Sequence, residues 1–188
     1  MNDVLSQALT DLTTWLRDEG FPFGLIGGLA VTVRGEPRVT MDVDVVLGVD
    51  VDQALRLLDQ LPGSPFRPLF HDVADVVRHS FLMPLQHSKT GIRVDIALGL
   101  SGFEQNAIAR ASEVSFGLFR VPVVTAEDLI LMKLLASRPR DTEDVHRIVQ
   151  RQGDALDWDY LLETGRQLQE AVDQDLVPQL EQLQESSE

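Results

Sequence analysis

Asp42 and Asp44 are the first residues whose types and spacing suggest chemistry. They flank Val43 and lead into a wholly apolar run over residues 45–47. On a β-strand, residues two apart project from the same face, so the two carboxylates can bind one hard cation. Mg²⁺ is commonly held by one or two carboxylates together with substrate phosphates. The same alternation is also typical of the solvated face of an edge strand, and the pair alone leaves both interpretations open.

Asp95 adds a third carboxylate to this pattern. It lies between Val94 and Ile96, so it faces away from the core side of a strand that can neighbour the first one. Three acids on one sheet face repel one another unless cations lie between them. A fold has little reason to gather such acids except for metal, and the three residues together therefore predict a metal site.

Gly27 and Gly28 are the second group of interest. They follow an apolar run over residues 21–26 and precede a predicted helix. Glycines at the start of a helix let backbone N–H groups approach a phosphate closely, and the helix N-terminus adds favourable partial charge. A diglycine is also common in tight turns without any ligand. If the first interpretation holds, the phosphates would lie beside the metals.

Hydrophobic periodicity predicts the elements that position these residues. In the first half of the chain we expect helices over residues 4–19, 29–34 and 51–58, and strands over residues 21–26 and 41–47. Two β-rich runs follow, over residues 76–85 and 92–98, and the polar turn between them indicates an antiparallel pair. A capping motif at Thr125 opens an apolar helix to about residue 136. Further helices are expected over residues 141–151, 158–168 and 177–183.

These elements predict an α/β (α+β) fold with a small mixed or antiparallel sheet flanked by helices. We expect a catalytic core over residues 1–122 and a helical C-terminal region over residues 123–188. The chain has no cysteine, which excludes disulfides, thiolate zinc sites and a cysteine nucleophile. No window is apolar enough for a membrane span and no leader is evident, so we expect a cytoplasmic protein.

The charge balance bears on possible partners. Sixteen Lys and Arg against thirty Asp and Glu give a formal net charge of −14. This field repels a long nucleic-acid backbone unless basic groups are locally clustered. A nucleotide that binds together with metal ions is different, because the cations invert the local sign of the charge.

The combined motifs resemble those of the DNA polymerase β-like nucleotidyltransferase superfamily. Residues 24–30 read GLIGGLA and residues 38–46 read RVTMDVDVV, which is similar to the superfamily pattern of an apolar strand, a Gly-Gly or Gly-Ser pair and an Asp-x-Asp strand. Asp95 matches the third acid of that pattern. Residues 133–144, KLLASRPRDTED, are similar to the helical region of a small bacterial branch related to abortive-infection (AbiEii-type) toxins and minimal nucleotidyltransferases.

The resemblance implies an enzyme that moves a nucleoside monophosphate from an NTP to a hydroxyl acceptor. It implies that Asp42, Asp44 and Asp95 hold two Mg²⁺ or Mn²⁺ ions, and that Asp95 accepts the proton of the acceptor hydroxyl. Many relatives have Ser where this chain has Gly28, and we expect the Thr40 hydroxyl to compensate. The acceptor is a small molecule, a protein or an RNA. The alternative function is a catalytically inactive transferase fold that acts as a partner protein or antitoxin-like binding module.

Three basic residues are candidates for nucleotide binding. Lys133 lies in the middle of an apolar helix, where it either contacts phosphate or extends along the surface into solvent. Arg38 and Arg34 flank the predicted site and either neutralise the triphosphate or belong to a solvated loop. The predicted nucleotide contacts are therefore the diglycine, Thr40, Arg38 and Lys133.

Overall fold

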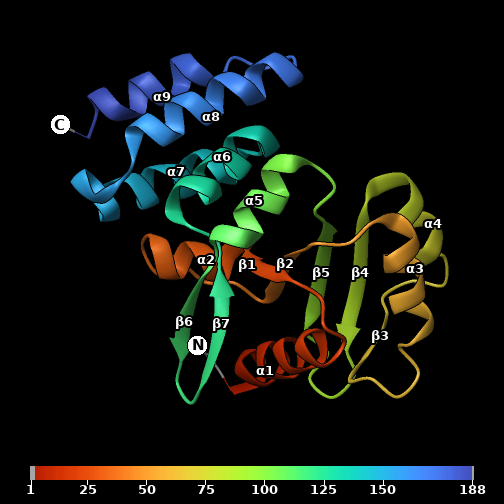
Figure 1. Cartoon of the computed structure of the whole chain (residues 1–188). Helices are drawn as coiled ribbons and strands as arrows, with labels where there is room; N and C mark the ends of the chain where they lie inside the picture. The colour runs from red at the N-terminus through yellow and green to blue at the C-terminus, as the bar shows by residue number, and fades with distance from the viewer. Residues whose placement is uncertain (1–2, 188) are drawn as a thin grey trace. The chain divides into compact units, whose positions relative to one another are not determined.

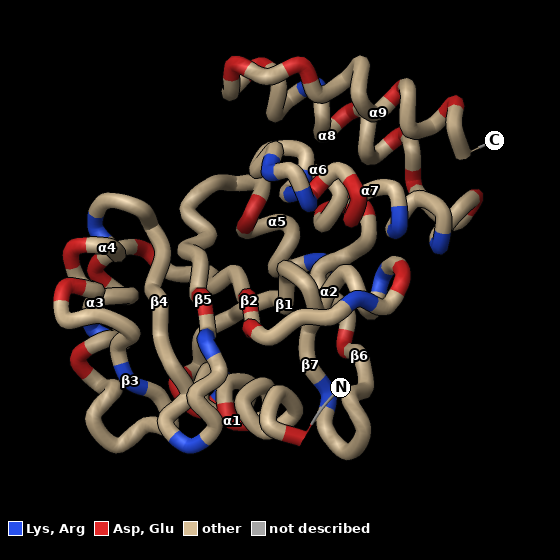
Figure 2. Tube along the Cα trace, turned by 180° about the vertical axis from the view of Figure 1, so that it is seen from behind, with Lys and Arg blue, Asp and Glu red and all other residues tan. Residues whose placement is uncertain are grey.

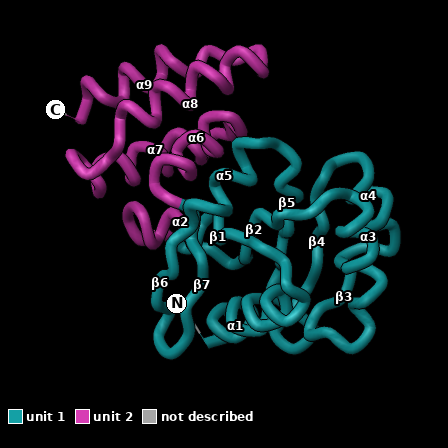
Figure 3. Tube along the Cα trace, viewed as in Figure 1, with its two compact units in different colours: residues 1–29, 39–124 teal, residues 30–38, 125–188 magenta. Residues whose placement is uncertain are grey.

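A computed structural model describes residues 3–187, and the chain divides into two compact units (Figure 3). The first unit comprises Met1–Leu29 and Val39–Val124, and the second comprises Ala30–Arg38 and Thr125–Glu188. The division after residue 124 lies beside the boundary expected from the sequence. Residues 30–38, which we expected in the catalytic core, instead belong to the helical unit.

The first unit is built on a seven-stranded mixed sheet in the order β3-β4-β5-β2-β1-β7-β6 (Figure 1). The strands are β1 (Phe23–Ile26), β2 (Asp42–Leu47), β3 (Phe66–Pro68), β4 (Leu82–His87), β5 (Arg93–Leu98), β6 (Ser112–Phe116) and β7 (Phe119–Val123). Strands β2 and β5 pair in parallel, as do β1 and β7, and the remaining neighbours are antiparallel. The mixed sheet confirms the predicted fold class.

Helix α1 (Asp3–Asp18) covers one face of this sheet. Its leucines at helical spacing are buried, as the sequence pattern predicts. Asp11 of α1 forms an ion pair with the buried His87 of β4, with 2.9 Å between the carboxylate Oδ2 and the imidazole Nε2. The pleat places Val43 and Val45 of β2 on the same face as His87, so the apolar side of β2 faces α1.

Helix α5 (Gly102–Arg110) lies over the opposite face of the sheet. A side chain at Gly24 would meet Ala111, the residue after α5, and Val46 of β2. Val46 shares its face with Asp44 and Asp42 because all three have the same parity along β2. Helix α5 therefore covers the C-terminal end of this face, while the aspartates occupy the N-terminal end of β2.

Helix α4 (Val73–Ser80) corrects one prediction. The strand expected over residues 76–85 exists only in its second half, as β4. Val73 and Val77 are buried one helical turn apart. This helical spacing of apolar residues outweighs the preference of the valines for β-strands. The helix ends at Phe81, which adopts a left-handed conformation with φ 54° and starts the chain into β4. Helix α3 (Val51–Asp59) begins with a capping box at Asp50.

The second unit contains α6 (Ala126–Ala136), α7 (Pro139–Gln152), a short 3₁₀ turn η1 (Gly153–Ala155), α8 (Trp158–Ala171) and α9 (Leu176–Glu185). The helix predictions for this region are confirmed. Tyr160 of α8 donates a hydrogen bond of 2.6 Å to the buried Asp128 of α6. Helix α2 (Gly27–Arg34) begins in the first unit and ends in the second. None of the helices within residues 3–187 is long and apolar enough to cross a bilayer.

Candidate active site

The acidic residues of β2 and β5 lie on neighbouring strands of the sheet (Figure 2). The parallel register sets Asp44 directly beside Asp95. Asp42 projects from the same face because it lies two residues before Asp44, whereas Val43 is fully buried on the other face. The structure thus places on one surface the three aspartates that the sequence singled out. We refer to Asp42, Asp44 and Asp95 as the acidic triad.

Gly27 holds Asp44 against the start of helix α2. Strands β1 and β2 pair so that Ile26 lies opposite Asp44, and Gly27 follows with a positive φ of 64°. A Cβ atom built on Gly27 would lie 1.9 Å from Oδ2 of Asp44. Only glycine fits here, both for its backbone conformation and for the space that the carboxylate occupies. The diglycine is therefore more than a tight turn, because α2 begins at Gly27 and this residue packs against Asp44.

Thr40 fixes the orientation of Asp42. Its hydroxyl donates a hydrogen bond of 2.5 Å to Oδ1 of Asp42. The sequence suggested that this hydroxyl would hold phosphate in place of the serine that relatives carry after the first glycine. In the structure it is bound to a triad carboxylate, so its position supports the site by orienting an acid.

Arg93 is the site residue that the sequence interpretation missed. Its Nε donates to Oδ1 of Asp95 at 3.0 Å and lies 2.9 Å from Oδ2, while half of its side chain is exposed. The register places Arg93 beside Asp42. The hydrogen bond with Asp95, together with the charges of Asp95, Asp42 and Asp44, raises the pKa of the guanidinium. The expectation that only metal could relieve repulsion among three acids was incomplete, because the chain supplies one cation itself.

The signal for Arg93 was present in the sequence. It lies two residues before Asp95, so it projects from the same face of β5. One guanidinium among three carboxylates leaves this group of four side chains with a formal charge of −2. Within residues 3–187, no three acidic or histidine side chains are grouped so that they could hold a metal ion together. The carboxylate of Asp95 instead accepts a hydrogen bond from Arg93, and that of Asp42 accepts one from Thr40.

Lys133 and Arg38, predicted to bind nucleotide, lie together in the second unit within a buried charge cluster. Lys133 Nζ lies 2.9 Å from Oδ1 of Asp141 and 2.7 Å from Oδ2 of Asp144, and its side chain is only 5% exposed. Arg38 Nε lies 3.1 Å from Oδ1 of Asp144. Arg138 Nε donates to Oδ2 of Asp141 at 2.8 Å. Lys133 thus neither reaches solvent along the surface nor presents a free ammonium group.

The remaining predicted residues are distributed between the units. Gly27, Gly28 and Thr40 belong to the first unit with the acidic triad, whereas Arg34 belongs to the second. The backbone oxygen of Arg34 accepts a hydrogen bond from Nε2 of Gln152. Burial lowers the pKa of the Arg34 guanidinium, and the negative charge of Glu127 offsets only part of this effect. The first unit therefore contains the predicted carboxylates, the glycine turn and the hydroxyl.

Solved structures share this fold at low sequence identity. An antigenic nucleotidyltransferase-like protein from Paracoccidioides brasiliensis is 15% identical with a TM-score of 0.56, over 98% of this chain and 93% of that one. The antibiotic-resistance factor ANT(2'')-Ia is 13% identical with a TM-score of 0.60, over 92% and 97%. The lincosamide antibiotic adenylyltransferase LnuA, with lincomycin bound, is 17% identical with a TM-score of 0.51, over 79% and 96%. At these identities the likeness concerns the fold alone.

A comparison with curated proteins gave no significant match. The family model described as "Nucleotidyl transferase AbiEii toxin, Type IV TA system" matches residues 13–187, which is most of the chain. This match includes the glycine turn, the acidic triad and the charge cluster. The chain therefore belongs to the AbiEii family of nucleotidyl transferase toxins, as the resemblance of its motifs to nucleotidyltransferases predicts.

Proposed function

We propose that the chain transfers a nucleoside monophosphate from an NTP to a hydroxyl acceptor at the acidic triad, with divalent metal. The observation that carries the proposal is the packing of Asp44 between two partners. Gly27 at the start of α2 lies on one side of it, and Asp95 of the parallel strand β5 lies on the other. Carboxylates and the positive end of a helix are thereby adjacent, which suits a metal-bound triphosphate.

The donor set of the triad fits Mg²⁺ or Mn²⁺. Asp42 and Asp44 offer hard carboxylate oxygens from one strand face, and cations of this kind are commonly held by one or two carboxylates plus phosphate oxygens. A group of three protein ligands is not required when the nucleotide supplies the others. When bound, such metal would neutralise the triphosphate and the charge that develops on the attacking and leaving oxygens.

Residues of the chain would then bind the phosphates, orient the carboxylates and accept a proton. The positive end of α2 would lie near the phosphates, and Thr40 keeps Asp42 in one orientation. The acceptor oxygen forms a bond to the α-phosphorus while the bond from that phosphorus to the bridging oxygen breaks, and pyrophosphate leaves. Asp95 accepts the proton of the acceptor hydroxyl on a carboxylate oxygen. Catalysis by this group is mainly positioning and charge neutralisation.

The acceptor class stays open among small molecules, proteins and RNA. The net charge of −14 disfavours a long RNA. The family description as a type IV toxin–antitoxin system fits the prediction of a partner protein. An inactive transferase fold is not favoured, because the carboxylates and the glycine turn of the motif are all present and meet in one unit.

The test is transfer of label from each α-labelled NTP into fractions of a cell lysate, with Mg²⁺ and again with EDTA. We expect one fraction to take up label in the presence of Mg²⁺, and Asp42→Asn to reduce this uptake by at least about 10³-fold, as for a group that acts on the transition state. Asp72→Asn is the matched control, because Asp72 lies in the same unit before α4 and makes no side-chain cap hydrogen bond. Equal labelling by Asp42→Asn and the wild type would rule the proposal out.

A further inference from the structure

Arg93 is a cation that the chain itself places against the acidic triad. Its guanidinium contacts both carboxylate oxygens of Asp95 and lies beside Asp42 in the strand register. The side chain of Asp95 is 17% exposed, whereas that of Arg93 is 50% exposed. The carboxylate is thus largely buried in the sheet surface, while half of the arginine side chain is exposed to solvent.

The energetics allow this contact to be replaced. An ion pair whose guanidinium side is half exposed contributes little to stability. A divalent cation between carboxylates provides twice the charge of a guanidinium. Arginine also binds phosphate well, because its planar fork matches two phosphate oxygens at once. A guanidinium displaced from Asp95 therefore has an anionic partner nearby whenever a triphosphate is bound at the triad.

We propose that Arg93 is an internal counter-ion of the acidic triad, which divalent metal displaces and which then binds the triphosphate. This inference rests on the proposed function, because it requires metal and nucleotide to meet at the triad. It accounts for the arrangement of the acids within the described chain, where Asp95 is directed to Arg93 and no three-ligand group is formed. Arg93 in this proposal first competes with the metal for Asp95 and then contacts the triphosphate directly.

Removal of the guanidinium should have opposite effects on two ligands. Without Arg93 the triad loses its competing cation, so metal alone should bind more tightly. The triphosphate loses a bidentate contact, so it should bind more weakly. A purely structural role for Arg93, in which it holds Asp95 in place, predicts weaker binding of both ligands.

The experiment compares the wild-type chain with Arg93→Gln. Binding of Mn²⁺ alone is measured from the electron paramagnetic resonance signal of free Mn²⁺, and binding of inorganic tripolyphosphate with Mg²⁺ is measured by calorimetry. We expect Mn²⁺ to bind Arg93→Gln roughly threefold to tenfold more tightly and tripolyphosphate to bind roughly tenfold more weakly. Adding Asp44→Asn to Arg93→Gln should remove the gain in Mn²⁺ affinity.

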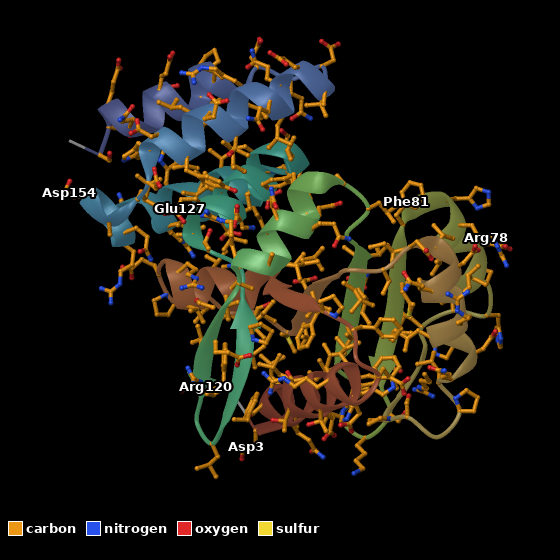
Figure 4. The ribbon with its side chains drawn as sticks, viewed as in Figure 1. Asp3, Arg78, Phe81, Arg120, Glu127 and Asp154 are labelled. Atoms are coloured by element: carbon orange, nitrogen blue, oxygen red, sulfur yellow. The ribbon has the colours of Figure 1, made fainter. Side chains whose placement is uncertain are left out.

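Arg78→Gln is the matched control. Arg78 lies on the outer side of α4 (Figure 4), has a side chain that is 51% exposed, and pairs with Asp75 at 2.9 Å. The substitution changes the net charge equally and breaks a comparable ion pair, so it should leave both affinities at wild-type values. Equal gains in Mn²⁺ affinity for both variants would assign the effect to net charge and overturn the proposal.

The other outcomes are also decisive. Mn²⁺ binding to Arg93→Gln that is no tighter than to the wild type, or undetectable in both, overturns the counter-ion role. Unchanged tripolyphosphate affinity overturns the transfer of Arg93 to phosphate. If Arg93→Gln gains Mn²⁺ affinity but the wild type labels no acceptor, only the proposed function fails. If labelling depends on Asp42 but Mn²⁺ affinity does not rise, only the role of Arg93 fails.

Discussion

Replacing Gly27 by alanine separates two demands that the structure makes on this residue. The positive φ of 64° costs an L-residue roughly 1–2 kcal/mol. The new Cβ would also lie 1.9 Å from Oδ2 of Asp44, whereas Cβ contacts below 3.0 Å are essentially never seen. The carboxylate must therefore retreat by about 1.1 Å, the difference between these two distances.

The size of the expected effects follows from these two terms. A misplacement of about 1 Å in a catalytic group can lower the rate about 10²-fold. The backbone strain should lower the melting temperature by about 2–8 °C, at about 2–4 °C per kcal/mol for a chain of this size. We therefore expect Gly27→Ala to fold, to melt slightly earlier, and to lose about 99% of its labelling activity.

Gly20→Ala provides the control for backbone strain. Gly20 has a similar φ of 74°, and a Cβ atom there would meet nothing within 4 Å. It should lose a comparable amount of thermal stability and keep its activity. Both variants are assayed by thermal unfolding and by transfer of α-labelled nucleotide. Labelling activity of Gly27→Ala within about threefold of Gly20→Ala would show that the close contact between residue 27 and Asp44 is not needed for transfer.

Two further predictions concern the hydroxyl at the site and the charge cluster. Thr40→Val removes the hydrogen bond to Asp42 and should lower transfer about tenfold, whereas Thr40→Ser should retain the rate; equal rates for both variants would contradict the positioning role. Burial alone would raise the pKa of Asp141, but hydrogen bonds from Arg138 and Lys133 outweigh it and lower the pKa. The resulting stability is present above the ordinary carboxyl pKa and is lost as the pH falls through the lowered value. Asp141→Asn should cost about 1–3 kcal/mol at neutral pH, because Lys133 keeps Asp144 as a partner. As the pH falls below about 4, the urea midpoint of the variant should change less with pH than that of the wild type; parallel pH profiles would refute this assignment.

The strand faces of the three acids could be predicted from the sequence because the signal for them is local. The period-2 alternation around Asp42 and Asp44 gives their common face without knowledge of the neighbouring strands. The same rule gives the face of Asp95. What alternation does not give is register, and Asp44 lies directly beside Asp95 only because β2 and β5 pair in parallel. Arg93 projects from the same face of β5 as Asp95. Counting the charged residues on that strand face would have identified it from the sequence.

The basic residues were harder to place because their partners are not local in sequence. Lys133 interrupts an apolar helix, so the sequence predicted that it either contacts phosphate or extends into solvent. In the structure, Asp141 and Asp144 on the next helix balance its charge in the interior. Arg38 lies in a loop, and nothing in its immediate neighbours indicates that Asp144 pairs with it. Helix–helix contacts decide such pairs, and a sequence pattern describes one helix at a time.

The parallel pairing of β2 and β5 also sets the moment in synthesis at which the site can exist. Asp95 is translated 51 residues after Asp44, and α3, β3, α4 and β4 lie between them. A parallel pair with so large a separation must close a long loop before it gains any contact, which makes it a late event in folding. A nascent chain therefore carries the glycine turn and two of the acids well before the third. A translation product that stops ahead of β5 lacks Asp95, and with it the complete triad.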